Sequence, residues 1–93
     1  YFKNYHNSIE FVKEIRSDPH KEVSGSKILS IEYFDKNSAK FLRSKYSGYI
    51  PEDTGSIIFI ELESDNEDRL MDSLSYLDKI LDDYETIKIS TSL

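Results

Sequence analysis

The chain has 93 residues, of which 38% are hydrophobic and 32% charged, with only three glycines and two prolines. This is the composition of one small globular domain and excludes a disordered or low-complexity segment. The net charge of −6 disfavours binding to nucleic-acid phosphates, and the absence of cysteine excludes disulfides and thiolate metal sites.

The ends of the chain and its apolar runs bear on where it acts. No apolar run approaches the roughly 20 residues of a membrane-spanning helix, and the longest, Ile57–Ile60, has strand length. The N-terminal residues lack the pattern of a signal peptide, so we expect a cytoplasmic location. Strand patterns lie close to both ends, which predicts a fragment of a larger protein. The alternative is that disordered or cleaved ends have been left out.

A short strand and an amphipathic helix are expected first. Residues 1–5 carry aromatic side chains on both faces and suit a strand. Asn7 is the expected N-cap of a helix over about 8–17, because Glu10 follows in the capping-box position. The helix is expected to end at Asp18-Pro19, since the residue before a proline avoids the α region.

A polar loop over 19–26 leads to a second strand over 27–34. Its alternation predicts two faces, one with Leu29, Ile31 and Tyr33 and the other with Ser30 and Glu32. Asp35 is the expected N-cap of a helix over about 36–46, because aspartate accepts hydrogen bonds from the free N–H groups of a first helical turn.

Turn residues over 51–55 precede a strand over 56–63, which is the most hydrophobic segment and is expected at the centre of the sheet. Its alternation predicts one face with Ile58, Ile60 and Leu62 and another with Ile57, Phe59 and Glu61. Ser64-Asp65 is then expected to cap a helix over 66–83. The apolar stripe of this helix consists of Leu70, Leu74, Leu77, Leu81 and Tyr84, widened by Met71 and Ile80. A last strand is expected over 86–90.

The predicted element order is β-α-β-α-β-α-β. Such alternation is typical of a parallel sheet. However, parallel sheets are covered on both faces, whereas the strands over 27–34 and 86–90 carry polar residues on one face. We therefore expect an α+β domain of ferredoxin-like type, with a mostly antiparallel or mixed sheet and its helices packed on one face.

No catalytic, cofactor-binding or metal-binding residue is predicted. His6 and His20 flank the first helix without any metal-ligand spacing, and are interpreted as exposed loop histidines. Glu61 and Glu63 share a strand face, and with Glu32 on a neighbouring strand they suggest an acid–base pair. Because no nucleophile or histidine accompanies them, polar decoration of an open sheet face is the preferred interpretation.

Two larger sets of side chains are also interpreted from the sequence. The acidic residues of the last helix do not follow the calcium-binding loop pattern and indicate a solvated face; they are Asp65, Glu67, Asp68, Asp72, Asp78, Asp82 and Asp83. Seven aromatic residues are divided between the core and an interface with another domain; they are Tyr1, Phe2, Tyr5, Tyr33, Phe34, Tyr46 and Tyr49.

Three runs then resemble a known family. They are residues 28–38, Ile50-Pro51-Glu52-Asp53 and residues 58–63. Together they resemble the C-terminal domain of FAD-linked oxidases of the glycolate oxidase and D-lactate dehydrogenase type, in the vanillyl-alcohol oxidase superfamily. In that family an "ELLD"-like strand leads into a helix, and here that run is Ile31-Glu32-Tyr33-Phe34-Asp35. An "lhvElEG"-like strand leads into a long amphipathic helix, and here that run ends in Glu61-Leu62-Glu63-Ser64. Here Ser64 replaces the usual glycine of the second motif.

The resemblance implies part of a substrate or cap domain, in an FAD-dependent oxidoreductase that acts on small 2-hydroxy acids. The flavin would be bound by an upstream domain of the same polypeptide, and hydride transfer would be carried out by parts not present here. The parent enzyme would be cytoplasmic or peripheral to a membrane. Arg16, Arg43 and Arg69 match none of the family's functional contexts, so no site residue is carried over and FAD is not expected to bind this chain alone.

The alternative is a stand-alone ferredoxin-like module that binds a small ligand or a protein. Regulatory modules of this kind usually have a glycine-containing loop after the first strand. Here His6-Asn7 occupies that place.

Overall fold

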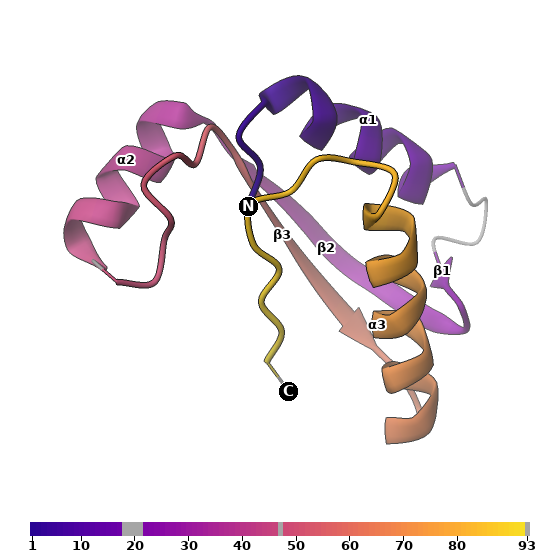
Figure 1. Ribbon diagram of the computed structural model, residues 1–93. Coiled ribbons are helices and arrows are strands. Elements are labelled where there is room, and N and C mark those ends of the chain that lie inside the picture. The colour runs from indigo at the N-terminus through magenta and orange to yellow at the C-terminus, as the bar shows by residue number, and fades with distance from the viewer. Residues whose placement is uncertain (18–21, 47, 93) are drawn as a thin grey trace.

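The computed structural model describes residues 1–17, 22–46 and 48–92. The elements in chain order are α1 (Tyr5–Arg16), β1 (Glu22–Val23), β2 (Ser26–Phe34), α2 (Lys36–Lys45), β3 (Ile57–Glu63) and α3 (Glu67–Leu81) (Figure 1). Within these residues the strands form one antiparallel sheet in the order β1-β2-β3. The α+β class is therefore confirmed, and the sheet is antiparallel.

The register of the sheet places β2 in the middle. β2 pairs with β1 through Glu22 opposite Lys27, and with β3 from Lys27 opposite Glu63 to Phe34 opposite Ile57. The expectation that the strand over 56–63 is central to the sheet is wrong for most of its length. Among the described residues, the edge of this strand opposite β2 is paired only at Ser56, just before β3 begins, where Phe2 forms a bridge.

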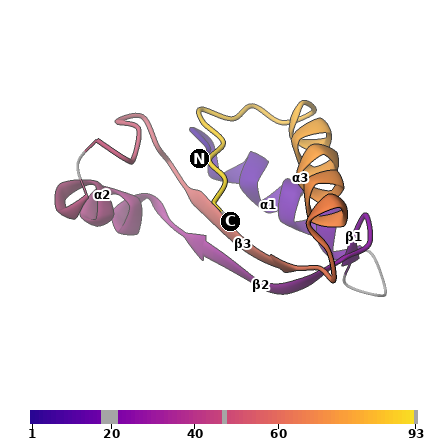
Figure 2. The ribbon, with the colours of Figure 1, turned by 90° about the horizontal axis from the view of Figure 1, so that it is seen from below.

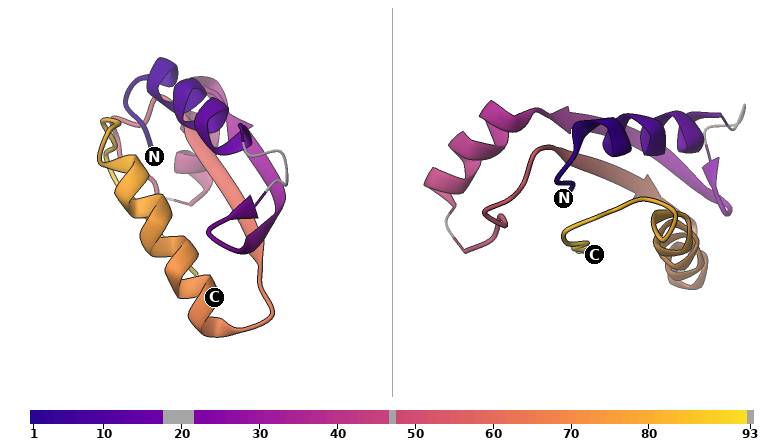
Figure 3. Two further views of the ribbon diagram at one scale, coloured as in Figure 1. Left: turned by 90° about the vertical axis from the view of Figure 1, so that its right-hand side faces the viewer. Right: turned by 45° about the horizontal axis from the view of Figure 1, so that its top comes forward.

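The helices do not all lie on one face, which corrects the sequence prediction. Figure 2 shows α1 and α3 on the same side of β2 and β3, whereas α2 lies beyond the end of the sheet. Two further views agree with this arrangement (Figure 3). Because α2 begins only two residues after β2 ends, the chain continues outward instead of folding back over the sheet. We call α2 together with residues 48–56 the projecting lobe.

The hydrophobic core lies between the sheet and the helices α1 and α3. Its buried members are Phe2, Phe11, Ile15, Val23 and Leu77. Aromatic rings hold its centre together: the ring centroids of Phe2 and Phe11 are 5.9 Å apart, and Tyr84 meets Phe11 edge-on at 5.8 Å. Through Phe11, these ring contacts connect the N-terminal segment and the segment after α3 to α1.

Pairs of serines make close contacts between the helices and the strand segments. Ser8 of α1 lies 2.9 Å from Ser56, and Ser73 of α3 lies 2.5 Å from Ser26, between hydroxyl oxygens. All four side chains are fully buried. Because serine is small and can satisfy its hydroxyl locally, these pairs let both helices approach the sheet closely.

The N-terminal segment differs from its prediction. Asn4, and not Asn7, caps the first helix, because its side chain accepts a hydrogen bond from the His6 N–H at 2.8 Å. The helix therefore starts at Tyr5, and the strand predicted over 1–5 is reduced to bridges made by Phe2. The predicted helix stop at residues 18–19 lies outside the described residues.

The loop predicted over 19–26 contains structure in its described part, because β1 and the first residue of β2 form a hairpin there. Ser24 and Gly25 form its turn, both with positive φ. A β-bulge between Ile28 and Ser30 then changes the alternation of β2. As a result Ile28 packs against the core, while Leu29, which was predicted beside Ile31, is 50% exposed.

The caps of the last two helices give one confirmation and one correction. Asp35 caps α2 as predicted, because its carboxylate accepts the Ser38 N–H at 2.7 Å, and this hydrogen bond lowers the pKa of Asp35. The cap of α3 is Asn66 and not Ser64-Asp65. The strand predicted over 86–90 is reduced to one bridge, between Thr86 and Phe2.

Candidate functional site

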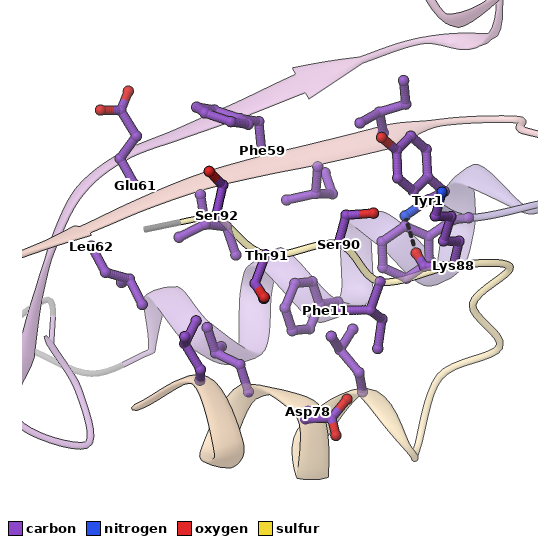
Figure 4. A pocket seen from close by; sticks show the side chains of 18 of the residues that line it. Tyr1, Phe11, Phe59, Glu61, Leu62, Asp78, Lys88, Ser90, Thr91 and Ser92 are labelled. Atoms are coloured by element: carbon purple, nitrogen blue, oxygen red, sulfur yellow. Dashed lines mark hydrogen bonds between the residues drawn. The ribbon is translucent and has the colours of Figure 1, made fainter. Parts of the chain in front are cut away.

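An open groove of about 680 Å³ lies between β3, α3 and the C-terminal segment. Figure 4 shows β3 on one side, α3 on the opposite side and residues 88–92 passing between them. The side chains that line it are mostly aliphatic. They include Ile58, Ile60, Leu62, Leu70, Leu74, Leu77 and Leu81.

Local periodicity directs these side chains into the groove. Alternation along β3 turns Ile58, Ile60 and Leu62 toward the helices, as the sequence predicts. The leucines of α3 follow spacings of three and four residues and therefore share one face of the helix. Among these leucines only Leu77 is buried, at 8% exposure. The groove is thus an extension of the core that the other described residues leave partly exposed to solvent.

The third wall of the groove is the C-terminal segment, which is attached to the first residue of the chain. The Ile87 N–H donates to the carbonyl oxygen of Tyr1 at 2.8 Å, and the Tyr1 amino group donates to the Lys88 carbonyl oxygen at 2.9 Å. Desolvation lowers the pKa of the Tyr1 ammonium. The amino terminus therefore stands at one end of the groove (Figure 4).

The chemistry of the lining is that of a binding surface. The charged residues that line it are Asp78, Lys88 and Glu61, and the side chain of Glu61 points away from the groove (Figure 4). Among the described residues, no group of three or more His, Asp or Glu side chains is placed to hold a metal ion. The arrangement is suited to bury apolar side chains.

The carboxylates considered for acid–base chemistry lie on the open sheet face. Glu61 accepts a hydrogen bond from the Ser30 hydroxyl at 3.0 Å. Glu32 stands opposite Phe59, and Glu63 stands opposite a lysine of β2. The register therefore places no two of these carboxylates opposite each other, and they decorate the face as the sequence analysis preferred.

The remaining candidates are scattered. His6 is exposed in the first turn of α1, and His20 lies outside the described residues. The acidic residues of the predicted last helix are all exposed; they are Asp65, Glu67, Asp68, Asp72, Asp78, Asp82 and Asp83. Among the aromatic residues Phe2 is buried in the core, whereas Tyr49 of the projecting lobe is 72% exposed.

Sequence reasoning missed the groove itself. It identified the aliphatic faces of β3 and α3, which are the signal for an apolar site. However, it also expected full strands at both chain ends, and the structure reduces these strands to the bridges made by Phe2.

No protein-family model, no curated protein and no solved structure matches this chain. In the described part of the chain, no helix is both long and apolar enough to cross a bilayer. The resemblance to FAD-linked oxidases therefore rests on the motif runs of the sequence alone.

Proposed function

We propose that this chain is part of the substrate or cap domain of an FAD-dependent oxidoreductase that acts on 2-hydroxy acids. The observation that carries the proposal is where the two motif runs fall. Residues 31–35 span the end of β2 and the cap of α2, and residues 61–64 span the end of β3 just before α3. In the resembled family the corresponding motifs also join a strand to a helix, and in the same order.

A ferredoxin-like arrangement is the finer fold proposed with this function. Phe2 bridges Ser56 on one side and Thr86 on the other, both antiparallel. Together with the β2–β3 ladder, these bridges order the segments as Thr86, Phe2, β3 and β2. This is the order expected of a four-stranded ferredoxin-like sheet in which the two pairings made by the first strand are short, and it supports the proposal.

The chain would contribute packing surface to the parent enzyme and not its chemistry. The groove does not suit FAD, because its lining is mostly aliphatic and includes the carboxylate of Asp78, which would repel a pyrophosphate. We assign no flavin-dependent step to these residues. The exposed aromatic residues of the projecting lobe, Phe41 and Tyr49, are suited to contact the flavin-binding domain, since aromatic side chains are enriched at protein–protein interfaces.

The proposal is tested with the complete reading frame that encodes these residues. Its product is expected to purify with bound flavin, and anaerobic addition of a 2-hydroxy acid is expected to bleach the flavin absorbance. The 93-residue chain mixed with FAD is the control and is expected to show neither effect. Turnover by the chain alone, or a start codon directly before Tyr1, would contradict the proposal.

The groove favours one second candidate, a stand-alone module that binds an apolar ligand. Its volume and aliphatic lining are in the range of small-molecule sites. This candidate predicts saturable, one-to-one binding of a fluorescent apolar probe to the 93-residue chain, weakened by Leu74→Asp on the lining. Binding that neither saturates nor responds to this substitution would exclude it.

A further inference from the structure

The edge of β3 that faces the groove is an unpaired strand edge. Phe2 and Ser56 exchange both backbone hydrogen bonds, at 2.9 and 3.0 Å. Because N–H groups alternate in direction along a strand, those of Ile58, Ile60 and Leu62 point to the same side as that of Ser56, away from β2. Beyond the β2–β3 ladder, the described residues offer these three N–H groups no backbone acceptor.

The C-terminal segment forms the opposite edge. Thr86 is antiparallel to Phe2, as Ser56 is, so residues 56–62 and 86–92 run in the same direction on either side of Phe2. The N-terminal chain lies between these two segments, and from Phe2 it continues to Tyr1, whose amino group donates to the Lys88 carbonyl oxygen. Beyond Tyr1 the same direction leads into the groove (Figures 1 and 4). The groove therefore lies between two edges that leave room for one strand.

The size of the groove agrees with one strand. A strand rise of about 3.3 Å, a strand spacing of about 4.8 Å and a layer spacing of about 10 Å give roughly 160 Å³ for each residue. The groove of about 680 Å³ then holds about four residues. Six residues of β3, from Ile57 to Leu62, flank it.

We propose that the groove is the seat of a further β-strand, supplied by the residues that immediately precede Tyr1 in a longer polypeptide. Such a strand pairs with β3 on one side and with residues 88–92 on the other, and it covers the leucines of α3. The Tyr1 nitrogen then makes the same hydrogen bond to Lys88 as a neutral peptide N–H, without the cost of desolvating an ammonium group. The inference is independent of the oxidoreductase proposal.

The register fixes which positions of the strand are apolar. Since Phe2 is opposite Ser56, the first, third and fifth residues before Tyr1 come opposite Ile58, Ile60 and Leu62 and face α3. The second and fourth face the open side of the sheet. The codons before Tyr1 are therefore expected to encode apolar residues at the first, third and fifth positions. Charged residues there would overturn the inference.

An extension of the chain tests the same register directly. Six residues, Thr-Val-Lys-Val-Thr-Val, are fused before Tyr1 so that valine occupies the first, third and fifth positions. The matched control, Val-Thr-Val-Lys-Val-Thr, has the same composition shifted by one residue. Hydrogen exchange of backbone amides is measured by NMR at Ile58, Ile60 and Leu62, with Phe59 and Glu61, which point toward β2, as internal references.

The in-register extension is expected to slow exchange at the three groove-facing amides about tenfold or more, because it gives them hydrogen-bond acceptors. The shifted extension is expected to leave them fast. Equal protection by both extensions, or by neither, would overturn the inference. Protection in the unextended chain that rises with protein concentration would assign the groove to a second copy and would also overturn it.

Discussion

Replacing Ser73 by alanine removes the hydroxyl group at the contact between α3 and the start of the sheet. The Ser73 oxygen lies 2.5 Å from the Ser26 hydroxyl oxygen and 2.6 Å from the Val23 carbonyl oxygen. Both serine side chains are fully buried. Alanine would therefore leave the Ser26 hydroxyl and the Val23 carbonyl without this partner, in a place that water does not reach.

The magnitude follows from that geometry. A buried polar group left without a partner costs about 1–3 kcal/mol. The better helix propensity of alanine offsets up to about 0.5 kcal/mol of this cost. We expect Ser73→Ala to lower the free energy of unfolding by about 1–2.5 kcal/mol, and the melting temperature by roughly 5–15 °C for a domain of this size.

Urea denaturation followed by far-UV circular dichroism measures the change. Ser75→Ala is the matched control, because Ser75 lies on the same helix and is exposed. The double variant Ser26→Ala with Ser73→Ala is expected to lose less than the two single changes together, since removing both partners leaves fewer unpaired groups. The reasoning is refuted if Ser73→Ala is as stable as Ser75→Ala, or if the two serine changes are additive.

Three further predictions concern other contacts. Leu77→Ala, in the floor of the groove, is expected to lower the unfolding free energy by about 2–4 kcal/mol, against less than about 1 kcal/mol for exposed Met71→Ala; similar urea midpoints would contradict this. Gly55→Ala would place a Cβ against the Lys3 carbonyl oxygen, too close for the backbone to stay in place, so faster amide exchange is expected at Ser56, and unchanged exchange would count against it. The hydrogen bond to a backbone N–H of α2 lowers the folded-state pKa of Asp35, so its stabilising effect is present above the unfolded pKa and is lost as the pH falls through the folded pKa. Asp35→Asn should therefore lose less stability than the unaltered chain between about pH 7 and about pH 3, and an equal loss would disprove this link.

The groove connects the packing of the domain with its proposed role. Its aliphatic residues are already aligned by β3 and α3, so little rearrangement is needed to bury them under another strand. A strand added there would join the domain to whatever precedes it. The open sheet face, with Phe59 half exposed, and the projecting lobe would remain as contact surfaces.

The sequence by itself determined the features that depend on local geometry. The alternation of Ile58, Ile60 and Leu62 and the helical spacing of the leucines from Leu70 to Leu81 identified the faces that line the groove. Asp35 identified the start of α2, because capping needs only a side chain and the next turn of backbone. The absence of a recognisable catalytic motif was also read from the sequence.

Only the tertiary structure decided which strands pair with each other and over how many residues each pairing extends. Whether Phe2 extends a strand depends on Ser56 and Thr86, which are far away in the sequence, and not on the residues beside it. The bulge that exposes Leu29 arises from the register with β3, which local alternation does not contain. Local sequence does not predict the groove either. The groove lies between β3 and the C-terminal segment, and it is open because no strand of the described residues pairs between them.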